Sequence, residues 1–469
     1  MTENWYQEVL LRKEDLLADV ERLLVIPSVR EDHLASKECP VGPGPKQALD
    51  EFLKMSEEAG FAQESFGNIV AHLDWGQGED LFGVMGHLDV VPVGDGWESD
   101  PFTPTYRDGK LFARGALDDK GPLVAAFFAM KLLKEKGFIP KKKVRLIVGT
   151  DEESDWKCLN YYQSICPIPK IGFVPDAYFP IVNGEKGNGS VVFEWQCQKD
   201  EKAAVTLESF EAGRRENMVA DRAEAEISGQ GLAAIARSFE DFVASYDFLQ
   251  GQVSWSQNKL ILQLKGKSAH GSKPEAGHNA ATYLAAFLSG YSFWGPYAQE
   301  FLTVLGKDLH LDYFGQGFGL AYSDPQMGQM TLNPGIISYK AQDVAHIRIN
   351  LRYPKGFDVS VARDLLVKGY STSLCNVFIE EKQKPHYVSE EHPMVQSLLK
   401  IYHEQTKLPA YERVIGGATY ARLMPEGVAF GALFPEAVDT MHQANEHIVV
   451  EDLLKATAMY ARAFVDLVC

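Results

Sequence analysis

Histidine and carboxylate residues flank several short apolar segments of this sequence. The residues at these positions are His87, Asp89, Asp118, Asp119, Glu152, Glu153, Asp176 and His442. Imidazole and carboxylate groups are the side chains that bind zinc and related divalent cations. Carboxylates gathered at one place repel one another, and bound cations would relieve that repulsion. The residue types therefore predict a metal centre.

Each of these residues also has an ordinary structural interpretation when it is taken alone. The His-x-Asp at 87–89 could be a hydrogen-bonded pair in a loop, and the pair at 118–119 could cap the helix that follows it. The glutamates at 152–153 could lie on a solvated surface, Asp176 in a turn, and His442 in a structural role. Their occurrence together, at successive strand ends, favours the metal centre.

The elements that must position these residues alternate between strand and helix over the first 180 residues. Apolar runs predict strands at 81–86, 143–149 and 171–174. Helical spacing predicts helices at 1–24, 47–60 and 122–136. This alternation is typical of an α/β fold, in which the carboxyl ends of parallel strands meet at one edge and bind ligands.

A different pattern begins near residue 187. Alternation of apolar and polar residues predicts antiparallel strands at 191–198, 259–266 and 345–354. Helices are predicted between them, at 231–248, 278–289 and 358–369. The α/β pattern resumes after residue 385, with elements predicted at 392–407, 427–434 and 450–467. We therefore expect one domain, formed by 1–186 and 385–469, to be interrupted by an α+β insert at 187–384.

Composition excludes several classes of protein. The 469 residues are 45% hydrophobic and 23% charged, as in ordinary globular domains, and the net charge is −18. An acidic surface repels nucleic acid and anionic lipid, and we find no apolar run long enough to span a bilayer. Six scattered cysteines without a CxxC pair favour reduced thiols in the cytoplasm. We find no P-loop, no GxSxG nucleophile elbow and no HExxH helix.

Five motifs spread over nearly the whole chain carry a resemblance to a known family. They are GHLDVVP, RGALDDKG, TDEES, GKSAHGSKPEAGHNAA and GGATYAR. The sequence resembles the di-zinc metallopeptidases of clan MH, which include dipeptidases, acetylornithine and succinyl-diaminopimelate deacylases and aminoacylases. It looks most similar to the PepV-type dipeptidases. The resemblance implies an aminopeptidase-like catalytic domain, with a mixed sheet flanked by helices, that is interrupted by a lid domain.

The resemblance also implies a role for each candidate metal ligand. It assigns two zinc ions, which manganese or cobalt could replace, to His87, Asp118, Glu153, Asp176 and His442. His87 and Asp176 would bind one ion, Glu153 and His442 the other, and Asp118 both. The peptide bond between Asp118 and Asp119 is expected to be cis.

Three further residues receive catalytic roles by the same resemblance. Asp89 would accept the second ring N–H of His87 and so fix its tautomer. Glu152 would be the general base that takes a proton from the attacking water. His270, in the predicted insert, would stabilise the oxyanion, which requires the insert to close over the metal centre. Without the resemblance, His270 would be interpreted as a surface histidine.

The same resemblance implies substrate contacts at Asn217 and Arg352, and the glycine-rich turn with Gly416 and Gly417 could offer backbone N–H groups to the substrate. The arginine could hold a terminal carboxylate through two parallel hydrogen bonds, although a surface arginine at a strand edge is the alternative. Relatives often have GGGTYA where this chain has Ala418, which changes the expected approach of the backbone to the substrate.

The sequence thus predicts a zinc-dependent dipeptidase that hydrolyses unblocked dipeptides. An N-acyl amino acid deacylase and a metal- and peptide-binding protein without turnover are the alternatives. Relatives with a short insert dimerise through it, so the long insert predicts a monomer. The expected partner is a small peptide, with no nucleic acid and no membrane, and the expected location is the cytoplasm.

Overall fold

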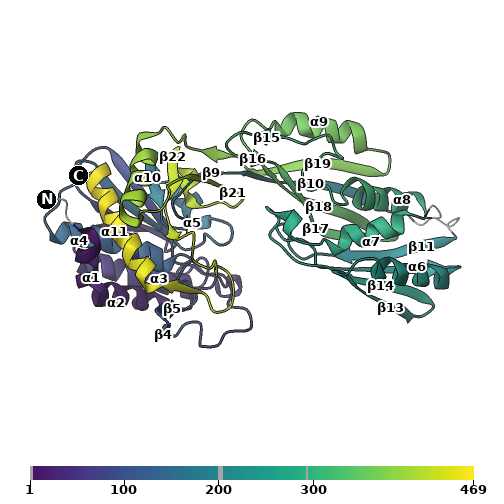
Figure 1. Ribbon diagram of the computed structural model, residues 1–469, viewed down its shortest axis with the longest axis horizontal. Coiled ribbons are helices and arrows are strands. Elements are labelled where there is room, and N and C mark those ends of the chain that lie inside the picture. The colour runs from purple at the N-terminus through teal and green to yellow at the C-terminus, as the bar shows by residue number, and fades with distance from the viewer. Residues whose placement is uncertain (1–3, 199–203, 292–293) are drawn as a thin grey trace. The chain divides into compact units, whose positions relative to one another are not determined.

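The computed structural model describes residues 4–198, 204–291 and 294–469, and in it the chain forms two compact units (Figure 1). The first unit comprises Met1–Gly184 and Tyr387–Cys469, and the second comprises Glu185–His386. The sequence placed these limits at 187 and 384. The assignment of the second unit as a lid stays a prediction.

A nine-stranded sheet forms the centre of the first unit. Its strands follow the order β1-β2-β6-β3-β7-β22-β9-β20, and β21 pairs with β9. Their bounds are β1 Ala62–Phe66, β2 Val70–Trp75, β3 Leu81–His87, β6 Lys143–Gly149, β7 Ile171–Val174, β9 Ile181–Glu185, β20 His386–Tyr387, β21 Glu412–Ile415 and β22 Glu426–Ala429. Strand β3 is parallel to β6 and β7, and β7 is parallel to β22, whereas β1, β2 and β6 pair antiparallel. The predicted mixed α/β fold is confirmed.

The parallel central strands gather their carboxyl ends at one edge of the sheet, which is where the candidate ligands lie. Two small sheets complete the unit. Their strands are β4 Thr105–Arg107, β5 Lys110–Phe112, β24 His447–Val449, β8 Ala177–Tyr178 and β23 Ala432–Leu433.

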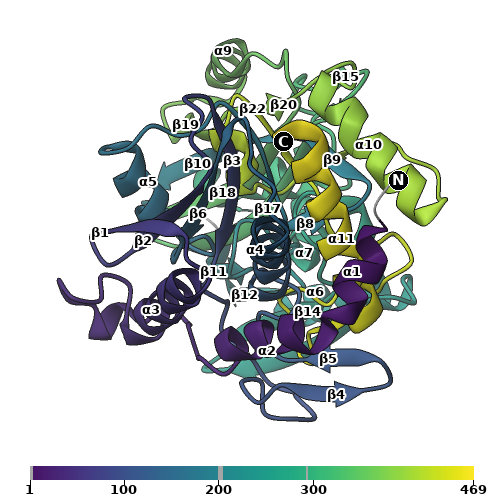
Figure 2. The ribbon, with the colours of Figure 1, turned by 90° about the vertical axis from the view of Figure 1, so that its left-hand side faces the viewer.

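Helices of the first unit lie around this sheet (Figure 2). They are α1 Trp5–Leu11, α2 Lys13–Leu24, α3 Pro43–Glu58, α4 Lys120–Glu135, α5 Lys157–Gln163, α10 Pro393–Thr406 and α11 Val450–Leu467. Helix α4 packs against β3 and α11, and it is buried over nearly its whole length. An all-round apolar helix of this kind belongs to the core.

The buried Lys120 fixes the start of α4. Its ammonium group donates to the carbonyl oxygens of Leu23 and Ile26, at 3.0 and 2.7 Å. Burial lowers the pKa of Lys120 to about 7. These contacts tie the end of α2 to the segment that carries Asp118.

Two predicted elements are divided in the structure. The predicted helix at 1–24 is two helices, because Arg12 leaves the helical conformation with φ −112° and ψ 18°; residues 1–3 lie outside the described residues. The predicted strand at 427–434 is divided between β22 and β23, and the Gly431–Ala432 peptide bond between them is cis.

The second unit is an eight-stranded sheet covered by helices. Its strand order is β13-β14-β12-β11-β17-β18-β10-β19. The strands are β10 Gly187–Gln196, β11 Val205–Ala212, β12 Arg222–Gly229, β13 Gln250–Ser256, β14 Lys259–Lys265, β17 Thr331–Lys340, β18 Val344–Tyr353 and β19 Cys375–Gln383, with a separate pair β15 Ser323–Asp324 and β16 Gly328–Gln329. The helices are α6 Leu232–Ala244, α7 Ala280–Ser289, α8 Pro296–Thr303 and α9 Val359–Tyr370.

Every pairing between neighbouring strands of this sheet is antiparallel. Buried and more exposed residues alternate along β12, where Ala223, Ala225 and Ile227 face the core. The α+β character predicted for the insert is therefore confirmed.

In the part of the chain that the structure describes, no helix has the length and apolarity needed to cross a bilayer. All six cysteines lie in that part, and none forms a disulfide.

A close approach between two central strands generates a stability prediction. A Cβ atom added at Gly172 in β7 would collide with the carbonyl oxygen of Gly83 in β3, whereas one added at Gly369 in α9 would meet nothing within 4 Å. We expect Gly172→Ala to lower the free energy of unfolding by about 1–3 kcal/mol. Gly369→Ala should leave it unchanged or raise it by up to about 1 kcal/mol. Urea denaturation measures both, and equal stability of the two variants would contradict the close approach.

Candidate metal centre

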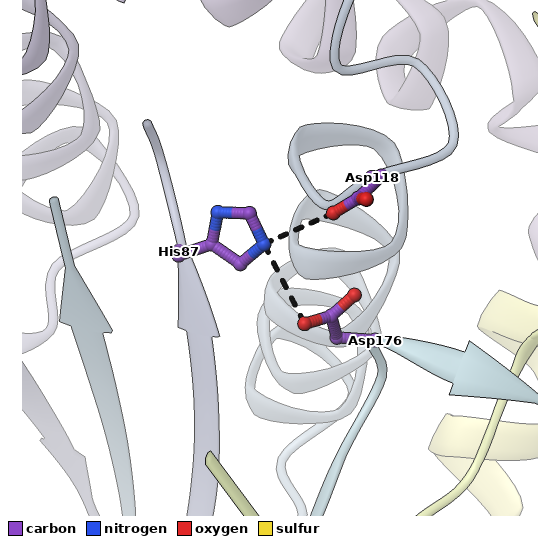
Figure 3. A group of neighbouring side chains, drawn as sticks. All are labelled: His87, Asp118 and Asp176. Atoms are coloured by element: carbon purple, nitrogen blue, oxygen red, sulfur yellow. Dashed lines mark hydrogen bonds and ion pairs between the residues drawn. The ribbon is translucent and has the colours of Figure 1, made fainter. Parts of the chain in front are cut away.

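Three ligand-type side chains meet at the carboxyl ends of β3 and β7 (Figure 3). Nε2 of His87 lies 3.1 Å from Oδ1 of Asp118 and 3.5 Å from Oδ2 of Asp176. His87 is the last residue of β3 and is fully buried, and Asp176 lies two residues beyond β7. The strand ends thus bring together residues that lie up to 89 positions apart in the sequence.

A second group of three side chains shares Asp118 with the first. Nε2 of His442 lies 3.0 Å from Oδ2 of Asp118 and 3.0 Å from Oε1 of Glu153. His442 is exposed, and its φ of 61° is in the left-handed region that few residues other than glycine adopt. Backbone conformations of this kind are concentrated at functional sites.

The donor atoms of both groups fit a divalent cation. Within each group one imidazole nitrogen and two carboxylate oxygens lie within 4.8 Å of one another. This is a donor set typical of zinc. Burial and then the charge of Asp118 raise the pKa of Glu153 to about 7 and that of Asp176 to about 6. The carboxylates of the two groups therefore repel one another, and bound cations would relieve this repulsion.

Asp118 belongs to both groups because of the loop that precedes α4. The loop ends at Asp119, directly before Lys120. The peptide bond between Asp118 and Asp119 is cis, which confirms that expectation. The two oxygens of Asp118 point to different histidines, as a carboxylate shared by two ions would require.

The contacts of Asp89 differ from those expected. The ring Nδ1 of His87 lies 2.9 Å from the main-chain carbonyl oxygen of Asp89, whereas the nearest carboxylate oxygen of Asp89 is 3.5 Å away. That carboxylate instead accepts the backbone N–H groups of Glu152 and Glu153, at 3.0 and 3.1 Å. Asp89 thus contacts His87 mainly through its main chain and holds the 152–153 turn with its side chain, because that turn presents two N–H groups to it.

Glu152 lies beside both groups but belongs to neither. Its side chain is partly buried, and among the described residues its carboxylate has no hydrogen-bond donor or salt-bridge partner. Burial raises the pKa of Glu152 well above its usual range; the charges of Asp176 and Glu153 act in the same direction, and His87 opposes them. Strongly shifted pKa values are concentrated among the acids and bases of functional sites.

The structure brings Asn217 and His270 together in the second unit. The backbone N–H of Gly271 donates to the carbonyl oxygen of Asn217 at 2.7 Å, and Met218 pairs with His270. The buried Asn333 side chain donates to the carbonyl oxygens on both sides of Asn217, at 2.8 and 2.9 Å. The imidazole of His270 is exposed, and its Nδ1 lies 2.7 Å from the Ser272 hydroxyl.

Arg352 lies in β18, an interior strand of the same sheet, and is only 6% exposed. Its Nε donates to Oδ1 of Asn350 at 2.9 Å. The interpretation as a surface arginine at a strand edge is therefore wrong, because β10 and β17 flank this strand. On the same face of β18, Arg348 contacts Glu216, the residue before Asn217.

Gly416 and Gly417 directly follow β21 in the first unit. A Cβ atom added at Gly417 would meet only the Ile415 side chain, at 3.8 Å. The chain itself therefore leaves space beside this turn.

Sequence reasoning missed two residues next to the metal centre, Arg114 and Glu446, which form a buried ion pair. Arg114 lies in the motif RGALDDKG, and Glu446 lies four residues after the predicted ligand His442. Neither could be distinguished there from an ordinary surface charge, because their partners lie more than 300 positions away.

Comparison with known proteins identifies the family. A profile of Peptidase family M20/M25/M40 matches residues 83–466. The chain is a member of this family. Membership confirms the predicted relationship and the prediction of a hydrolase, and the matched region contains every candidate metal ligand.

Close relatives of this M20-family chain match it over its full length. It is 40% identical over 467 residues to "Putative dipeptidase SSP1012" of Staphylococcus saprophyticus, which covers 99% of each chain. It is 40% identical over 466 residues to "Putative dipeptidase YtjP" of Bacillus subtilis, again over 99% of each chain.

Solved structures show the same fold. The aminoacylhistidine dipeptidase of Vibrio alginolyticus matches with a TM-score of 0.57 at 12% identity over 96% of each chain. The di-peptidase Dug1p of Saccharomyces cerevisiae matches with a TM-score of 0.55 at 13% identity over 98% of each chain. At such identities the likeness concerns the fold.

The shared position of Asp118 generates a prediction about metal content. If both groups bind an ion, Asp118→Ala should abolish binding of both, whereas Asp176→Ala should reduce the content from two ions per chain to one. Asp155→Ala, at an exposed aspartate outside both groups, is the control and should keep two. Elemental analysis after equilibrium dialysis against zinc gives the stoichiometry. Loss of only one ion in Asp118→Ala would contradict the shared site.

Proposed function

We propose that this M20-family protein is a metallo-dipeptidase that hydrolyses unblocked dipeptides. The observation that carries the proposal is a pair of candidate metal-ligand groups sharing Asp118, with the carboxylate of Glu152, which has no donor among the described residues, beside them. The names of the relatives described above support the substrate class. A protein that only bound metal and peptide would have no use for a free base at this position.

Five residues would hold two cations, with zinc favoured by the nitrogen and oxygen donors. They are His87, Asp118, Glu153, Asp176 and His442. When bound, the cations would lower the pKa of a water molecule and polarise the scissile carbonyl. Manganese or cobalt could serve the same ligands.

Glu152 would act as the general base and then the general acid. Its carboxylate would take a proton from the attacking water, and its raised pKa suits the return of that proton to the leaving amine. Asp89 holds the backbone of this turn through two N–H groups, so the base would be kept at a fixed place beside the ligands.

The second unit would supply the remaining groups as a lid. His270 would donate a hydrogen bond to the developing oxyanion, and Asn217, joined to it through Gly271, would contact the substrate. The guanidinium of the buried Arg352 would pair with the terminal carboxylate. The open space beside Gly417 would let the backbone N–H groups of Gly416 and Gly417 approach the same carboxylate.

Location and assembly belong to the same proposal. Six cysteines without a disulfide suit a reducing cytoplasm. The length of the second unit, residues 185–386, suits a monomer in which the lid takes the place that a partner subunit has in short-insert relatives.

A panel of substrates tests the proposed function. The zinc-loaded protein would be offered a free dipeptide, its N-acetylated and C-amidated forms, a tripeptide and succinyl-diaminopimelate, before and after chelation. We expect cleavage of the free dipeptide alone, lost on chelation and restored by metal. Preference for the acylated compounds would overturn the dipeptidase assignment in favour of a deacylase.

Glu152→Gln separates the proposed base from the metal ligands. The amide cannot accept the proton, so kcat should fall by about a hundredfold to ten-thousandfold while two ions remain bound. Glu240→Gln, at an exposed glutamate of α6, is the matched control and should keep full activity. Full activity of Glu152→Gln, measured by release of free amino acid, would refute the mechanism.

A further inference from the structure

A fully buried ion pair lies directly behind the candidate metal centre. Nη1 of Arg114 lies 2.7 Å from Oε2 of Glu446, and each side chain is only 1% exposed. A buried pair of this kind contributes little net stability, because desolvation of both charges offsets their attraction. Net stability therefore does not account for this ion pair, and its hydrogen bonds with the main chain indicate another role.

The Glu446 carboxylate accepts three backbone N–H groups of the loop that precedes α4 and carries Asp118. Gly115 donates to both oxygens at 3.1 Å, Leu117 to Oε1 at 2.9 Å and Asp118 itself to Oε1 at 3.1 Å. With Arg114 this makes four donors on one carboxylate. The backbone of the residue shared by both ligand groups is thus fixed by a side chain from the far end of the sequence.

Arg114, the cation of this ion pair, also contacts the segment that follows His87. Its Nη2 donates to the carbonyl oxygens of Pro92 and Val93, at 3.3 and 3.2 Å. Its guanidinium carbon lies 5.2 Å from the centre of the Trp97 ring. The loop that follows β3 and its terminal His87 is therefore held by the cation of the pair.

Glu446 also belongs to the segment that carries His442. It lies four residues beyond that histidine, and its carbonyl oxygen accepts the N–H of Ala113 at 3.2 Å. The next residue, His447, begins β24 and pairs with Phe112 of β5. Glu446 therefore connects the segment that carries His442 with the segment that carries Asp118.

We infer that Glu446, held by Arg114, is a positioning residue for both metal ions. The pair connects the three segments that carry His87, Asp118 and His442, without offering a ligand itself. An apolar pair could fill the same volume, but only a carboxylate can accept three converging N–H groups. The inference rests on the metal centre of the proposed function, and it is tested by metal affinity.

The test compares zinc affinity in the full-length variants. Zinc-loaded protein is titrated with a chromogenic chelator, and the competition gives the dissociation constants. We expect Glu446→Gln to weaken binding of both ions by about 10–100-fold, since the amide places an N–H₂ group against backbone donors. Asp74→Asn is the control, because Asp74 forms a partly buried two-bond pair with Arg145 at 2.7 and 2.8 Å, between β2 and β6. It should leave zinc affinity unchanged.

Arg114→Lys provides a second variant should Glu446→Gln fail to fold. Lysine keeps a positive charge near Glu446 but lacks the fork that reaches Pro92 and Val93, so we expect a smaller loss of zinc affinity than for Glu446→Gln. The midpoint of thermal unfolding is measured for every variant. Zinc affinity equal to that of the control in the folded variants, with only the midpoint lowered, would assign the pair a merely structural role and overturn the inference.

Dipeptide hydrolysis measured in parallel separates the two proposals. If the unaltered protein binds zinc but cleaves no dipeptide, the proposed function is wrong. A selective loss of zinc affinity in Glu446→Gln would still support the positioning role in that case.

Discussion

Repulsion between carboxylates is the constraint on which the first unit depends. Asp118, Glu152, Glu153 and Asp176 converge at one edge of a sheet, and the pKa values of the last three are raised by burial and by the charge of Asp118. Such a gathering is costly in a chain without cations. The surrounding loops must therefore be held firmly enough to keep these groups together.

Two further carboxylates hold these loops in place. They belong to neither candidate ligand group, and they accept hydrogen bonds from backbone N–H groups. Asp89 accepts two N–H groups of the turn with Glu152 and Glu153, and Glu446 accepts three in the loop that precedes α4 and carries Asp118. Each of these carboxylates thus fixes the backbone of a segment that carries candidate metal ligands. Hydrogen bonds to a charged acceptor are stronger than those between neutral groups, which suits this purpose.

In the second unit, side-chain and backbone hydrogen bonds hold the segment around Asn217 in a similar way. Asn333 fixes the main chain on both sides of it, Gly271 binds its carbonyl oxygen, and Glu216 is held by Arg348. The segment is therefore ordered within its own unit. His270, which is exposed, lies next to this ordered segment.

The sequence by itself determined the central strands, most helices and the types of the ligand groups. Apolar runs and helical spacing are local properties, so β3, β6, β7, α4 and α11 could be predicted nearly to the residue. Motifs placed the candidate ligands at strand ends, and the rule that parallel strands share a carboxyl edge placed them together.

Tertiary structure alone decided how those ligands are supported. The break at Arg12, the division of 427–434, the backbone contacts of Asp89 and the pairing of Arg114 with Glu446 have no local signal. Glu446 and the loop that it holds are about 330 residues apart in the sequence. Only the tertiary fold places its carboxylate within hydrogen-bonding distance of three backbone N–H groups of that loop. Periodicity reports which face of an element is buried, but it carries no information about which distant backbone groups that face will meet.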